Sequence, residues 1–516
     1  MKGGNHMAKD YDVIVIGAGN GGLYAGAFTA KNGLKTLIVE KHNIPGGSAT
    51  SFVRGRFDFE TSLHELCNLG TAENPGGVMK LFQAVGADVE WATNMEESFR
   101  LIIPDEGIDA AMPCGVREFV GALEQLVPGS APVMMQLIPV GQMCVEAYSF
   151  MDDPSCTPEL LQEKYPDFFK YAGHSFNEVM DAFGMPEKAK AILGTYWCYL
   201  GANLDELDFA IYIRMLLGYL AYGAGMPKYR SHEISLALEK VVRDNGGEIW
   251  YNTEVNKILV RDGKAYGVVI GGKEYEASYI VSNAYPAAAY GKMIDPAEVP
   301  ARACKLVNSR RRGLSFCMVY LGMNKSMEEL GFTNYSNFIS PSSDTRKVQE
   351  SATDTYEYSG YVIINCLNKA LPGCTPDGTC QLMLTTPYFG TGWDNVTEDM
   401  YEKLKNDTAR RMIEHCEQVL GISITPYIEE IVIATPMTFA RYLNTPGGTP
   451  YGYQVTPSDS FIQRGIVNND EQFIKDLYFV GAASKYGDGY SSAYLSGFDA
   501  GKNIIRAERE KGGIER

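Results

Sequence analysis

The sequence lacks the features of a membrane-spanning chain, a secreted disulfide framework and a zinc site. Its eleven cysteines are scattered, odd in number and include no Cys-x-x-Cys pair, so we expect a reducing compartment and no metal. The most apolar stretch, residues 207–226, is interrupted by Asp208 and Arg214. A spanning helix needs about 20 predominantly apolar residues with few or no charges. The stretch therefore predicts a buried helix, with a shallow dip into a membrane surface as the alternative.

Positive charge is also scarce. The 516 residues include 46 lysines and arginines against 63 aspartates and glutamates, for a formal net charge of −17. A field of this sign repels nucleic acids and anionic lipid surfaces, although a small apolar patch can still give peripheral membrane contact. Residues 1–10 are polar and lack the apolar core of a signal peptide, so we expect a cytoplasmic protein. The length predicts two or three domains.

The most informative feature that is present is a short apolar strand running into a glycine-rich turn. Residues 13–16 are followed by Gly17, Gly19 and Gly22, the pattern that opens a βαβ nucleotide-binding fold. The first glycine permits the tight turn, the second lets the backbone approach a pyrophosphate, and the third lets the helix pack closely on the strand. The free N–H groups at the start of that helix favour an anion.

A second strand, residues 36–39, delivers Glu40, which stands 18 residues after Gly22. A carboxylate at this place can accept hydrogen bonds from ribose hydroxyls. A glycine-rich turn alone is weak evidence, because any junction between a strand and a helix can contain one. The strand, the helix and the spaced acid together predict dinucleotide binding.

Two later segments have the same character. From about residue 225 the pattern predicts a helix over 235–243 and strands over 248–251, 257–260, 265–270 and 279–284. Near the C-terminus it predicts a strand over 477–482, a loop at 487–489 and a helix over 492–506. Between these segments, residues 118–222 are predicted to be helical, and residues 305–435 alternate strands (314–321, 361–366, 381–386) with a helix over 397–420. We therefore expect an α/β fold whose nucleotide domain is assembled from separate pieces.

Motifs along nearly the whole chain follow one family pattern. Glu40-Lys41 is followed by Pro45-Gly46-Gly47, by Thr50-Ser51, by the run Phe59-Glu60-Thr61-Ser62-Leu63-His64 and, much later, by Val281-Ser282-Asn283 and residues 477–497. This order resembles the phytoene desaturase, carotenoid isomerase and retinol saturase family within the amine-oxidase-like flavoproteins. The chain departs from that family where Glu60 and Ser62 replace the usual acid and glycine of its Phe-Asp-Thr-Gly-x-His motif.

The resemblance implies the domain organisation and the cofactor. Residues 8–75, 226–290 and 436–516 would form a discontinuous Rossmann-type FAD-binding domain, and residues 76–225 and 291–435 an inserted substrate-binding domain of mixed sheet and helices. A second dinucleotide fingerprint is missing, so the redox partner would be another protein or NAD(P)H that visits the flavin. The expected cofactor-binding residues are Gly17, Gly19, Asn20, Gly21, Gly22, Glu40, Lys41, Gly46, Gly47, Ser48, Thr50, Ser51, Val255, Gly481, Asp488, Tyr490, Ser491 and Ser492.

Three residues are candidates for the chemistry beside the flavin. The resemblance places His64 near the reactive ring, and the C-terminal loop adds Tyr486 and Tyr490. Each could supply a proton next to a hydride transfer, and a free imidazole pKa near ~6.5 suits proton exchange. The alternative for His64 is a structural hydrogen bond beside the pyrophosphate loop, and for the tyrosines it is packing against ring or substrate. Arg56 and Asp58 are expected to form a structural pair around the Gly46-Gly47 loop.

The function that follows is an FAD-dependent oxidoreductase. The resemblance implies saturation or desaturation of a carbon–carbon bond in an apolar unsaturated small molecule such as a carotenoid, retinoid, steroid or fatty acyl compound. Three alternatives stay open: a redox-neutral double-bond isomerase, an amine oxidase, and a non-catalytic lipid-binding carrier. An amine oxidase would need an aromatic pair flanking the flavin and a conspicuous substrate-binding acid, whereas no sequence feature separates the isomerase.

Overall fold

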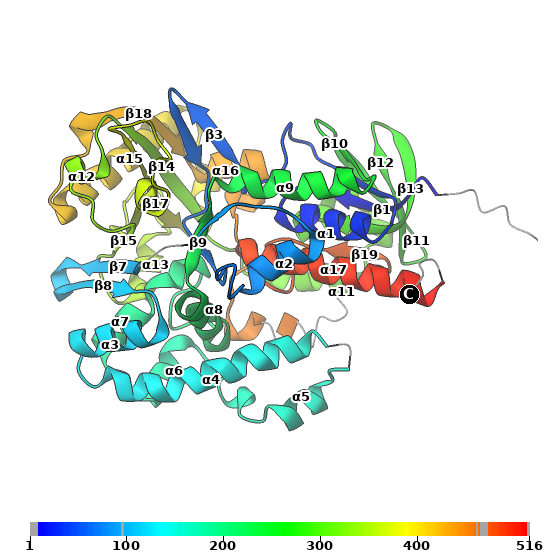
Figure 1. Cartoon of the computed structure of the whole chain (residues 1–516). Helices are drawn as coiled ribbons and strands as arrows, with labels where there is room; N and C mark the ends of the chain where they lie inside the picture. The colour runs from blue at the N-terminus through cyan, green and yellow to red at the C-terminus, as the bar shows by residue number, and fades with distance from the viewer. Residues whose placement is uncertain (1–8, 94–96, 154, 461–462, 465–472, 513–516) are drawn as a thin grey trace, which may run out of the picture.

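The computed structural model describes residues 9–93, 97–153, 155–460, 463–464 and 473–512. Two large β-sheets lie side by side, and a group of helices covers one end of the molecule (Figure 1). The expectation drawn from residues 1–10 falls almost wholly outside the described residues. No described helix is both long and apolar enough to cross a membrane.

The first sheet joins strands from three separated parts of the chain. Its order is β10-β2-β1-β13-β12-β11, and β19 also pairs with β13. The strands are β1 (Tyr11–Ile16), β2 (Thr36–Val39), β10 (Glu248–Trp250), β11 (Val255–Arg261), β12 (Lys264–Ile270), β13 (Lys273–Ser282) and β19 (Leu477–Phe479). β10, β2, β1, β13 and β19 are parallel, whereas β11 and β12 form an antiparallel extension. Parallel strands are buried on both faces, which explains the nearly continuous apolar runs in β1 and β2.

Three helices pack on one face of this sheet. They are α1 (Asn20–Lys31), α9 (Ser231–Asp244) and α17 (Tyr490–Glu510), and their apolar side chains share one core with β1, β2 and β13. α1 lies against both α9 and α17, as Figure 1 shows. Gly497 of α17 lies directly on the backbone of α1, where a Cβ would overlap the carbonyl oxygen of Gly21. The C-terminal helix is therefore an integral part of the nucleotide fold.

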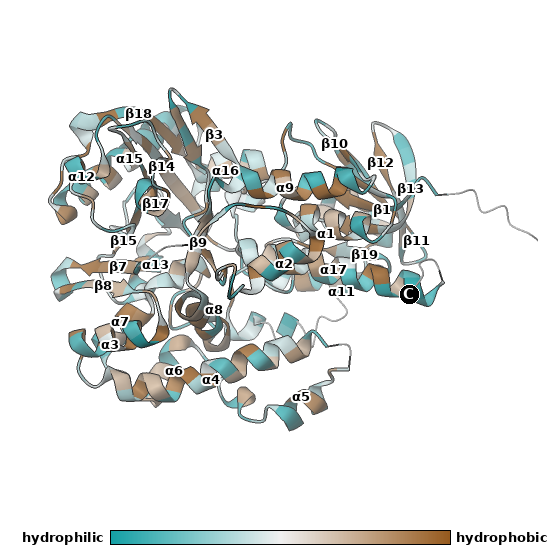
Figure 2. Cartoon of the chain, in the orientation of Figure 1, coloured by the Kyte–Doolittle hydropathy of each residue, from teal (hydrophilic) through white to brown (hydrophobic). Residues whose placement is uncertain are grey.

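The second sheet is almost entirely antiparallel. Its order is β18-β14-β17-β16-β15-β7-β8, and only the β15–β7 pair is parallel. The strands are β7 (Glu97–Ile103), β8 (Ile108–Pro113), β14 (Ser315–Met323), β15 (Ser336–Ile339), β16 (Val362–Cys366), β17 (Cys380–Tyr388) and β18 (Ile428–Ala434). Every residue of β14 and β17 is buried, because α15 (Glu398–Leu420) packs on one face of the sheet and the helical region on the other. Figure 2 shows these strands as largely hydrophobic.

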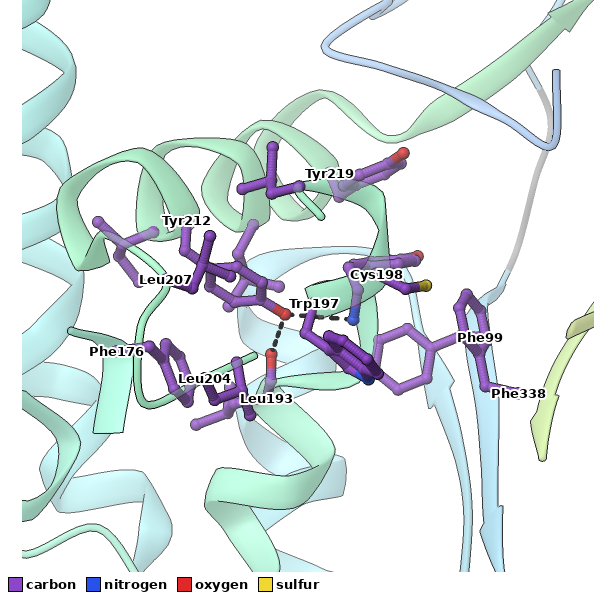
Figure 3. Close-up of a cluster of buried hydrophobic side chains, with 14 of the residues drawn as sticks. Phe99, Phe176, Leu193, Trp197, Cys198, Leu204, Leu207, Tyr212, Tyr219 and Phe338 are labelled. Carbon is purple, nitrogen blue, oxygen red and sulfur yellow. Dashed lines mark hydrogen bonds between the residues drawn. The ribbon is translucent and has the colours of Figure 1, made fainter. Parts of the chain in front are cut away.

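The helical region follows β8 in the chain. Its helices are α3 (Val116–Leu126), α4 (Ser130–Met151), α5 (Pro158–Lys164), α6 (Phe176–Ala182), α7 (Glu187–Leu193) and α8 (Phe209–Tyr222). Figure 3 shows the buried cluster that joins α8 to the sheet. At its centre the hydroxyl of Tyr212 donates to the carbonyl of Leu193 at 2.8 Å and accepts from the backbone N–H of Tyr196 at 3.2 Å. A buried phenol thus satisfies two backbone groups that the packing has removed from water.

The apolar stretch 207–226 is a buried helix followed by a strand. Asp208 caps α8 by accepting the N–H of Ile211 at 3.0 Å, and Gly223, with φ of +68°, ends the helix. The next residues form β9 (Ala224–Pro227), which pairs with β5 (Leu66–Cys67) and β6 (Trp91–Ala92). The sequence pattern missed this strand because its residues continue the apolar run of the helix.

The remaining elements are short. They are β3 (Ser51–Arg54), β4 (Phe57–Glu60), α2 (Gly77–Val85), α10 (Pro286–Ala288), α11 (Ala301–Ser309), α12 (Met327–Leu330), α13 (Thr345–Ser351), α14 (Leu367–Ala370) and α16 (Pro436–Leu443). The expected pair of Arg56 with Asp58 is wrong. The β3–β4 turn carries Arg56 to the edge of the second sheet, where its guanidinium binds both carboxylate oxygens of Glu429 at 2.7 and 2.8 Å.

The α/β class and the discontinuous nucleotide fold are confirmed. The strand that was expected over 279–284 is the second half of β13, whose first half belongs to the β11–β12–β13 extension. The alternation of polar residues at 273–276 concealed that continuity in the sequence. We propose the domain boundaries given above on the basis of the two sheets, since the first takes its strands from 11–39, 248–282 and 477–479 and the second from 97–113, 315–388 and 428–434.

Candidate cofactor and substrate site

A cavity of about 1090 Å³ opens at the carboxyl ends of the parallel strands. Gly17, Glu40, Asn283 and Val480 directly follow β1, β2, β13 and β19, and all four line it. Ligands of open α/β sheets bind outside the carboxyl ends of the strands. The volume lies at the upper end of the range for small-molecule sites, roughly 300–1,000 Å³.

The turn between β1 and α1 has the geometry that its glycines predict. Gly17 has φ of +92°, which favours glycine, and a Cβ on Gly22 would overlap the carbonyl oxygen of Gly17. α1 begins at Asn20, and no side chain caps its first N–H groups. The Oδ1 atom of Asn20 is buried without a hydrogen-bond partner in the described part of the chain. The N-terminal end of α1 therefore offers unpaired backbone N–H groups to an anion in the cavity.

Glu40 is held by the backbone at the end of β2. Its Oε2 accepts the N–H of Ala18 at 2.7 Å, and its Oε1 accepts the N–H of His42 at 2.8 Å. Each carboxylate oxygen has a further lone pair for another donor. The carboxylate is thus fixed beside the glycine turn and still able to accept ribose hydroxyls.

The C-terminal segment closes the site from the other side. Asp488 is 6% exposed, and its Oδ2 has no hydrogen-bond partner within the described ranges. Burial raises the pKa of Asp488 to about 7. α17 starts two residues later with no acidic side chain in its first turn, so the positive end of the helix dipole faces the cavity wall formed by Tyr490, Ser491 and Ser492.

Tyr490 joins this segment to the N-terminal glycine loop. Its hydroxyl donates to the carbonyl of Ser48 at 2.9 Å and lies 3.2 Å from the Oγ of Ser62. Ser62, which replaces the glycine usual in the resembling family, also donates to that carbonyl at 3.1 Å. Burial keeps the pKa of the Tyr490 phenol well above its ordinary value. Its hydroxyl is therefore a structural link, and it stays protonated.

His64 lies in the substrate half of the cavity. Its Nδ1 is 3.0 Å from the hydroxyl of Tyr199, and its Nε2 is 3.0 Å from the Oγ1 of Thr385. Burial lowers the pKa of the imidazole to about 4, so the ring is neutral at neutral pH. A neutral ring holds two hydrogen bonds here, which makes it a poor donor of a proton by itself.

Tyr486 lies on the cavity wall near α4. Its hydroxyl donates to Oδ1 of Asp152 at 2.6 Å, and burial together with the charges of Asp499 and Asp152 raises its pKa far above the ordinary value. The neighbouring Lys485 forms an ion pair with Asp499 at 2.9 Å. Tyr486 is thus a protonated wall residue with its hydroxyl directed at a carboxylate.

The far end of the cavity is apolar. Its wall comes from α3, α4, α8 and β14, through Val116, Ile138, Ile211, Met215, Phe316 and Met318. Three polar residues share this part of the wall, namely Gln142 and Glu146 of α4 and Arg214 of α8. One end of the cavity is therefore lined by glycines and backbone groups, and the other end mainly by aliphatic and aromatic side chains.

The structure brings most of the predicted site residues to this one cavity. The predicted residues on its wall are Gly17, Gly19, Asn20, Gly21, Glu40, Lys41, Gly46, Gly47, Ser48, His64, Val255, Gly481, Tyr486, Asp488, Tyr490, Ser491 and Ser492. Gly22, Thr50 and Ser51 do not line it. Gly22 faces β1, the hydroxyl of Thr50 bonds Thr61 at 3.0 Å, and Ser51 pairs with Glu60 in the β3–β4 hairpin.

Among the polar residues of the wall to which sequence reasoning assigned no role are Glu65, Tyr199, Asn283 and Thr385. Asn283 carried a signal, since it directly follows a buried strand of a parallel sheet. Glu65 carried a weaker one, as a charged neighbour of His64. Tyr199 and Thr385 come from a short helix and a strand that hold other hydroxyl and polar residues as well, and nothing local distinguishes them.

The residues present fit a flavin dinucleotide. The unpartnered oxygens of Asn20 and Asp488 stand on the same wall as the fixed Glu40 carboxylate and the glycine turn, and all can bind a pyrophosphate, a ribose and a polyol chain. A Cβ on Gly21 would lie 2.5 Å from the backbone nitrogen of Gly481, so the N- and C-terminal segments meet at backbone distance. Among the described residues, no three His, Cys, Asp or Glu side chains gather as a metal site.

Family models match two parts of the chain. The model described as flavin containing amine oxidoreductase matches residues 159–505, and the model described as NAD(P)-binding Rossmann-like domain matches residues 15–84. The second match covers β1, α1, β2 and Glu40, which form one wall of the cavity.

Several relatives align with most of the chain at low sequence identity. Prolycopene isomerase of carrot (Daucus carota) is 25% identical over 95% of this chain and 79% of its own length. All-trans-retinol 13,14-reductase of zebrafish (Danio rerio) is 22% identical over 87% of this chain and 78% of its own length. Among solved structures, cyclohexylamine oxidase of Brevibacterium oxydans superposes with a TM-score of 0.59 at 16% identity, covering 97% of this chain and 99% of that one.

Proposed function

The chain belongs to the flavin containing amine oxidoreductases, with FAD as cofactor, and from that premise we propose that it saturates or desaturates a carbon–carbon bond of an apolar, unsaturated small molecule. Carotenoids, retinoids, steroids and fatty acyl compounds are the substrate classes considered. The observation that carries the proposal is the continuous cavity, which has dinucleotide-binding features at one end and an apolar wall at the other.

Two relatives support the substrate class. Their names refer to the isomerisation of prolycopene and to the reduction of retinol at the 13,14 bond, and both molecules are apolar and unsaturated. The apolar wall contributed by α4, α8 and β14 suits such a ligand, because burying apolar surface favours binding. An amine substrate, in contrast, would bring an ammonium to a wall whose acids, Glu65 and Glu146, are accompanied by Arg214.

FAD supplies hydride transfer when it is bound, and the protein positions it and tunes it. We assign to FAD binding the predicted residues on the cavity wall. The glycine turn and the start of α1 hold the pyrophosphate, Glu40 holds the ribose, and Asp488 accepts a hydroxyl of the ribityl chain. Tyr490 keeps the C-terminal segment on the Ser48 loop through its 2.9 Å hydrogen bond, which fixes the width of the site.

His64, Tyr486 and Tyr490 are assigned to positioning. The neutral His64 holds Tyr199 and Thr385 in place, and the tyrosines stay protonated because burial raises their pKa values. The apolar side chains of the far wall exclude water from the bond that reacts. Few water molecules can then donate a proton to the carbon on which charge develops during the reaction.

The proposed function is tested with the purified holoenzyme. We expect the visible spectrum of bound flavin, and we expect anaerobic oxidation of the dithionite-reduced enzyme by one class of polyene or unsaturated lipid, with a saturated product identified by mass spectrometry. Products with a moved or inverted double bond and no net change of the flavin after many turnovers would instead show an isomerase. Reduction of the flavin by a polar amine would show an amine oxidase, and failure to retain added FAD would show a carrier.

A further inference from the structure

Glu65 is a buried acid on the cavity wall to which the sequence assigned no role. It lies between His64 and β5, and it is 6% exposed. Its Oε1 accepts one hydrogen bond, from the hydroxyl of Tyr199 at 3.1 Å. Its Oε2 is buried and has no partner in the ranges that the structure describes. A buried carboxylate is unfavourable when one of its oxygens accepts no hydrogen bond, so burial favours the protonated form of Glu65.

The contrast with Glu60 shows how unusual this arrangement is. Glu60 is buried to a similar degree, but its carboxylate accepts the hydroxyl and N–H of Ser231 at 2.8 Å and the N–H groups of Ser62 and Leu63 at 3.3 and 3.2 Å. Four donors surround that acid, whereas Glu65 has one. Glu60 is therefore fixed by its four hydrogen bonds. The protonated Oε2 of Glu65, in contrast, has no acceptor among the described residues.

The hydrogen bonds that lead to Glu65 have one consistent direction. Tyr199 donates its only proton to Glu65, so its oxygen must accept from the Nδ1–H of His64 at 3.0 Å. A neutral imidazole with its proton on Nδ1 has an unprotonated Nε2, which then accepts from the hydroxyl of Thr385 at 3.0 Å. Thr385 also lines the cavity. The row Thr385–His64–Tyr199–Glu65 therefore orients every proton toward Glu65.

The thiols and phenols that interact electrostatically with Glu65 carry no positive charge that would stabilise its carboxylate. The thiols among them are Cys67, Cys114 and Cys198, and the phenols are Tyr196, Tyr199, Tyr219, Tyr335 and Tyr451. Burial raises the pKa of each of these groups, so they stay uncharged at neutral pH, as does His64. Burial raises the pKa of Glu65 itself to about 8, close to the range that suits a general acid at neutral pH.

We propose that Glu65 is the proton donor of the reaction, an inference that rests on the proposed function and extends it. In the saturating direction the π electron pair of the substrate forms a C–H bond with the proton on Oε2. Bound reduced FAD would supply the hydride, which carries its own electron pair and would form the second C–H bond on the neighbouring carbon. The π bond is lost, the cofactor is oxidised, and Glu65 is left as a carboxylate. An external two-electron donor, such as reduced nicotinamide, restores the cofactor.

The rest of the row positions the acid and returns its proton. After the transfer, Tyr199 can pass its proton to Oε1 of Glu65 and take one from His64, while His64 takes one on Nε2 from the Thr385 side. Rotation of the carboxyl group then brings the new proton to the Oε2 position. A water molecule or a substrate hydroxyl at the cavity end of Thr385 supplies the proton that enters. Tyr199, His64 and Thr385 are therefore positioning residues, and they need not touch the reacting carbons.

The test compares wild-type holoenzyme with Glu65→Gln, which keeps the shape and loses the acid, and with Glu163→Gln on the exposed surface of α5 as a matched control. Infrared difference spectra between pH 7 and pH 10 require no substrate. We expect the wild type to lose a carbonyl band of a protonated carboxyl group with a midpoint near pH 8, as the shift of Glu65 indicates. Glu65→Gln should lack this component and keep only the one that Asp488, with a pKa of about 7, contributes in both proteins. A wild-type carboxylate already ionised at pH 7 would overturn the inference.

Turnover supplies the second measurement. With a reducible polyene, Glu65→Gln should lower kcat by about 100- to 10,000-fold while FAD content and reduction by dithionite stay unchanged. Glu65→Asp should restore part of the rate, and the product formed in D2O should carry one deuterium beside the carbon that received hydride. Tyr199→Phe removes the one donor to Glu65, so the alkaline limb of the pH–rate profile should move upward, which a purely structural role would not cause.

The two proposals fail in different ways. A wild-type holoenzyme that turns over no apolar unsaturated compound contradicts the proposed function. A wild-type enzyme that does turn one over, with Glu65→Gln equally fast and equally labelled, contradicts the role of Glu65 alone.

Discussion

The two halves of the cavity are built by different means. In the nucleotide half the contacts come from backbone and glycine: Ala18 and His42 hold Glu40 through N–H groups, and Gly21 meets Gly481 at backbone distance. In the substrate half they come from side chains of distant elements, such as His64 with Thr385, 321 positions apart. At Gly21 the first half therefore has no room for a side chain, whereas in the second half a side chain can be exchanged for another of the same shape without moving the backbone.

The largest expected effect tests the backbone half. Gly21→Val places a branched side chain where a Cβ alone would lie 2.5 Å from the backbone nitrogen of Gly481, so α1 and the C-terminal loop must separate. We expect the purified variant to lose FAD, with an affinity at least about 100-fold weaker, because a branched side chain forced against backbone costs about 3 kcal/mol or more, the upper end of the range for overpacking. Flavin absorbance after gel filtration measures it.

Gly121→Val is the matched control, because nothing lies within 4 Å of a Cβ at this exposed position of α3. It should keep its flavin. A Gly21→Val protein with full FAD occupancy would contradict the view that close backbone contacts build the nucleotide half of the cavity.

A smaller effect tests the side-chain half through pH. The folded-state pKa of Glu65 is raised from 4.5 to about 8, so its contribution to stability is fully present below about pH 4.5 and is lost as the pH rises to 8. Glu65→Gln removes this dependence. The free energy of unfolding of the variant relative to wild type should therefore rise between pH 5 and pH 7.5, by about 3 kcal/mol given roughly 1.4 kcal/mol for each pH unit.

Denaturant unfolding of the holoenzymes at several pH values measures this difference. Other buried acids with raised pKa values, Asp208 at about 6 and Asp488 at about 7, occur in both proteins and cancel. A difference between the two proteins that is constant across this pH range would mean that Glu65 is ionised throughout, which also contradicts its role as acid.

The smallest effect sharpens the comparison within the substrate half. Tyr212→Phe keeps the ring in the cluster of Figure 3 and removes the hydroxyl that bonds Leu193 and Tyr196. Two buried backbone groups lose their partner, so we expect a loss of about 1–3 kcal/mol in the free energy of unfolding with unchanged FAD content. Tyr222→Phe, at the exposed end of α8, is the control and should leave the denaturation midpoint where it is.

The same contrast explains what could be predicted from the sequence. The β1–α1–β2 unit with Glu40 is local, because its strand, turn, helix and acid follow one another within 30 residues, and periodicity with glycine spacing describes it well. The C-terminal strand and helix were also found, since the loop between them keeps its glycines. These features depend on backbone conformation, which short sequence patterns encode directly.

The chemistry of the substrate half could not be predicted in this way. Glu65, Tyr199 and Thr385 come from a loop, a 3-10 helix and a strand that meet only in the folded chain. The roles of His64 and Tyr486 depend on burial and on a partner far away in sequence. The Arg56–Glu429 pair was mistaken for a local one for the same reason. Side chains that meet only through tertiary contacts have no regular spacing in the sequence by which they could be recognised.

The arrangement of the first sheet also has a consequence for how the protein is made. β13 receives β19 only when residues 477–479 have left the ribosome, and α17 forms after that. Until then the outer edge of β13 offers unpaired backbone groups to other chains, and the cleft has no C-terminal wall. Capture of the yellow coenzyme must then be among the last events of biosynthesis, so the supply of flavin in the cell should decide how much newly made chain reaches its mature form.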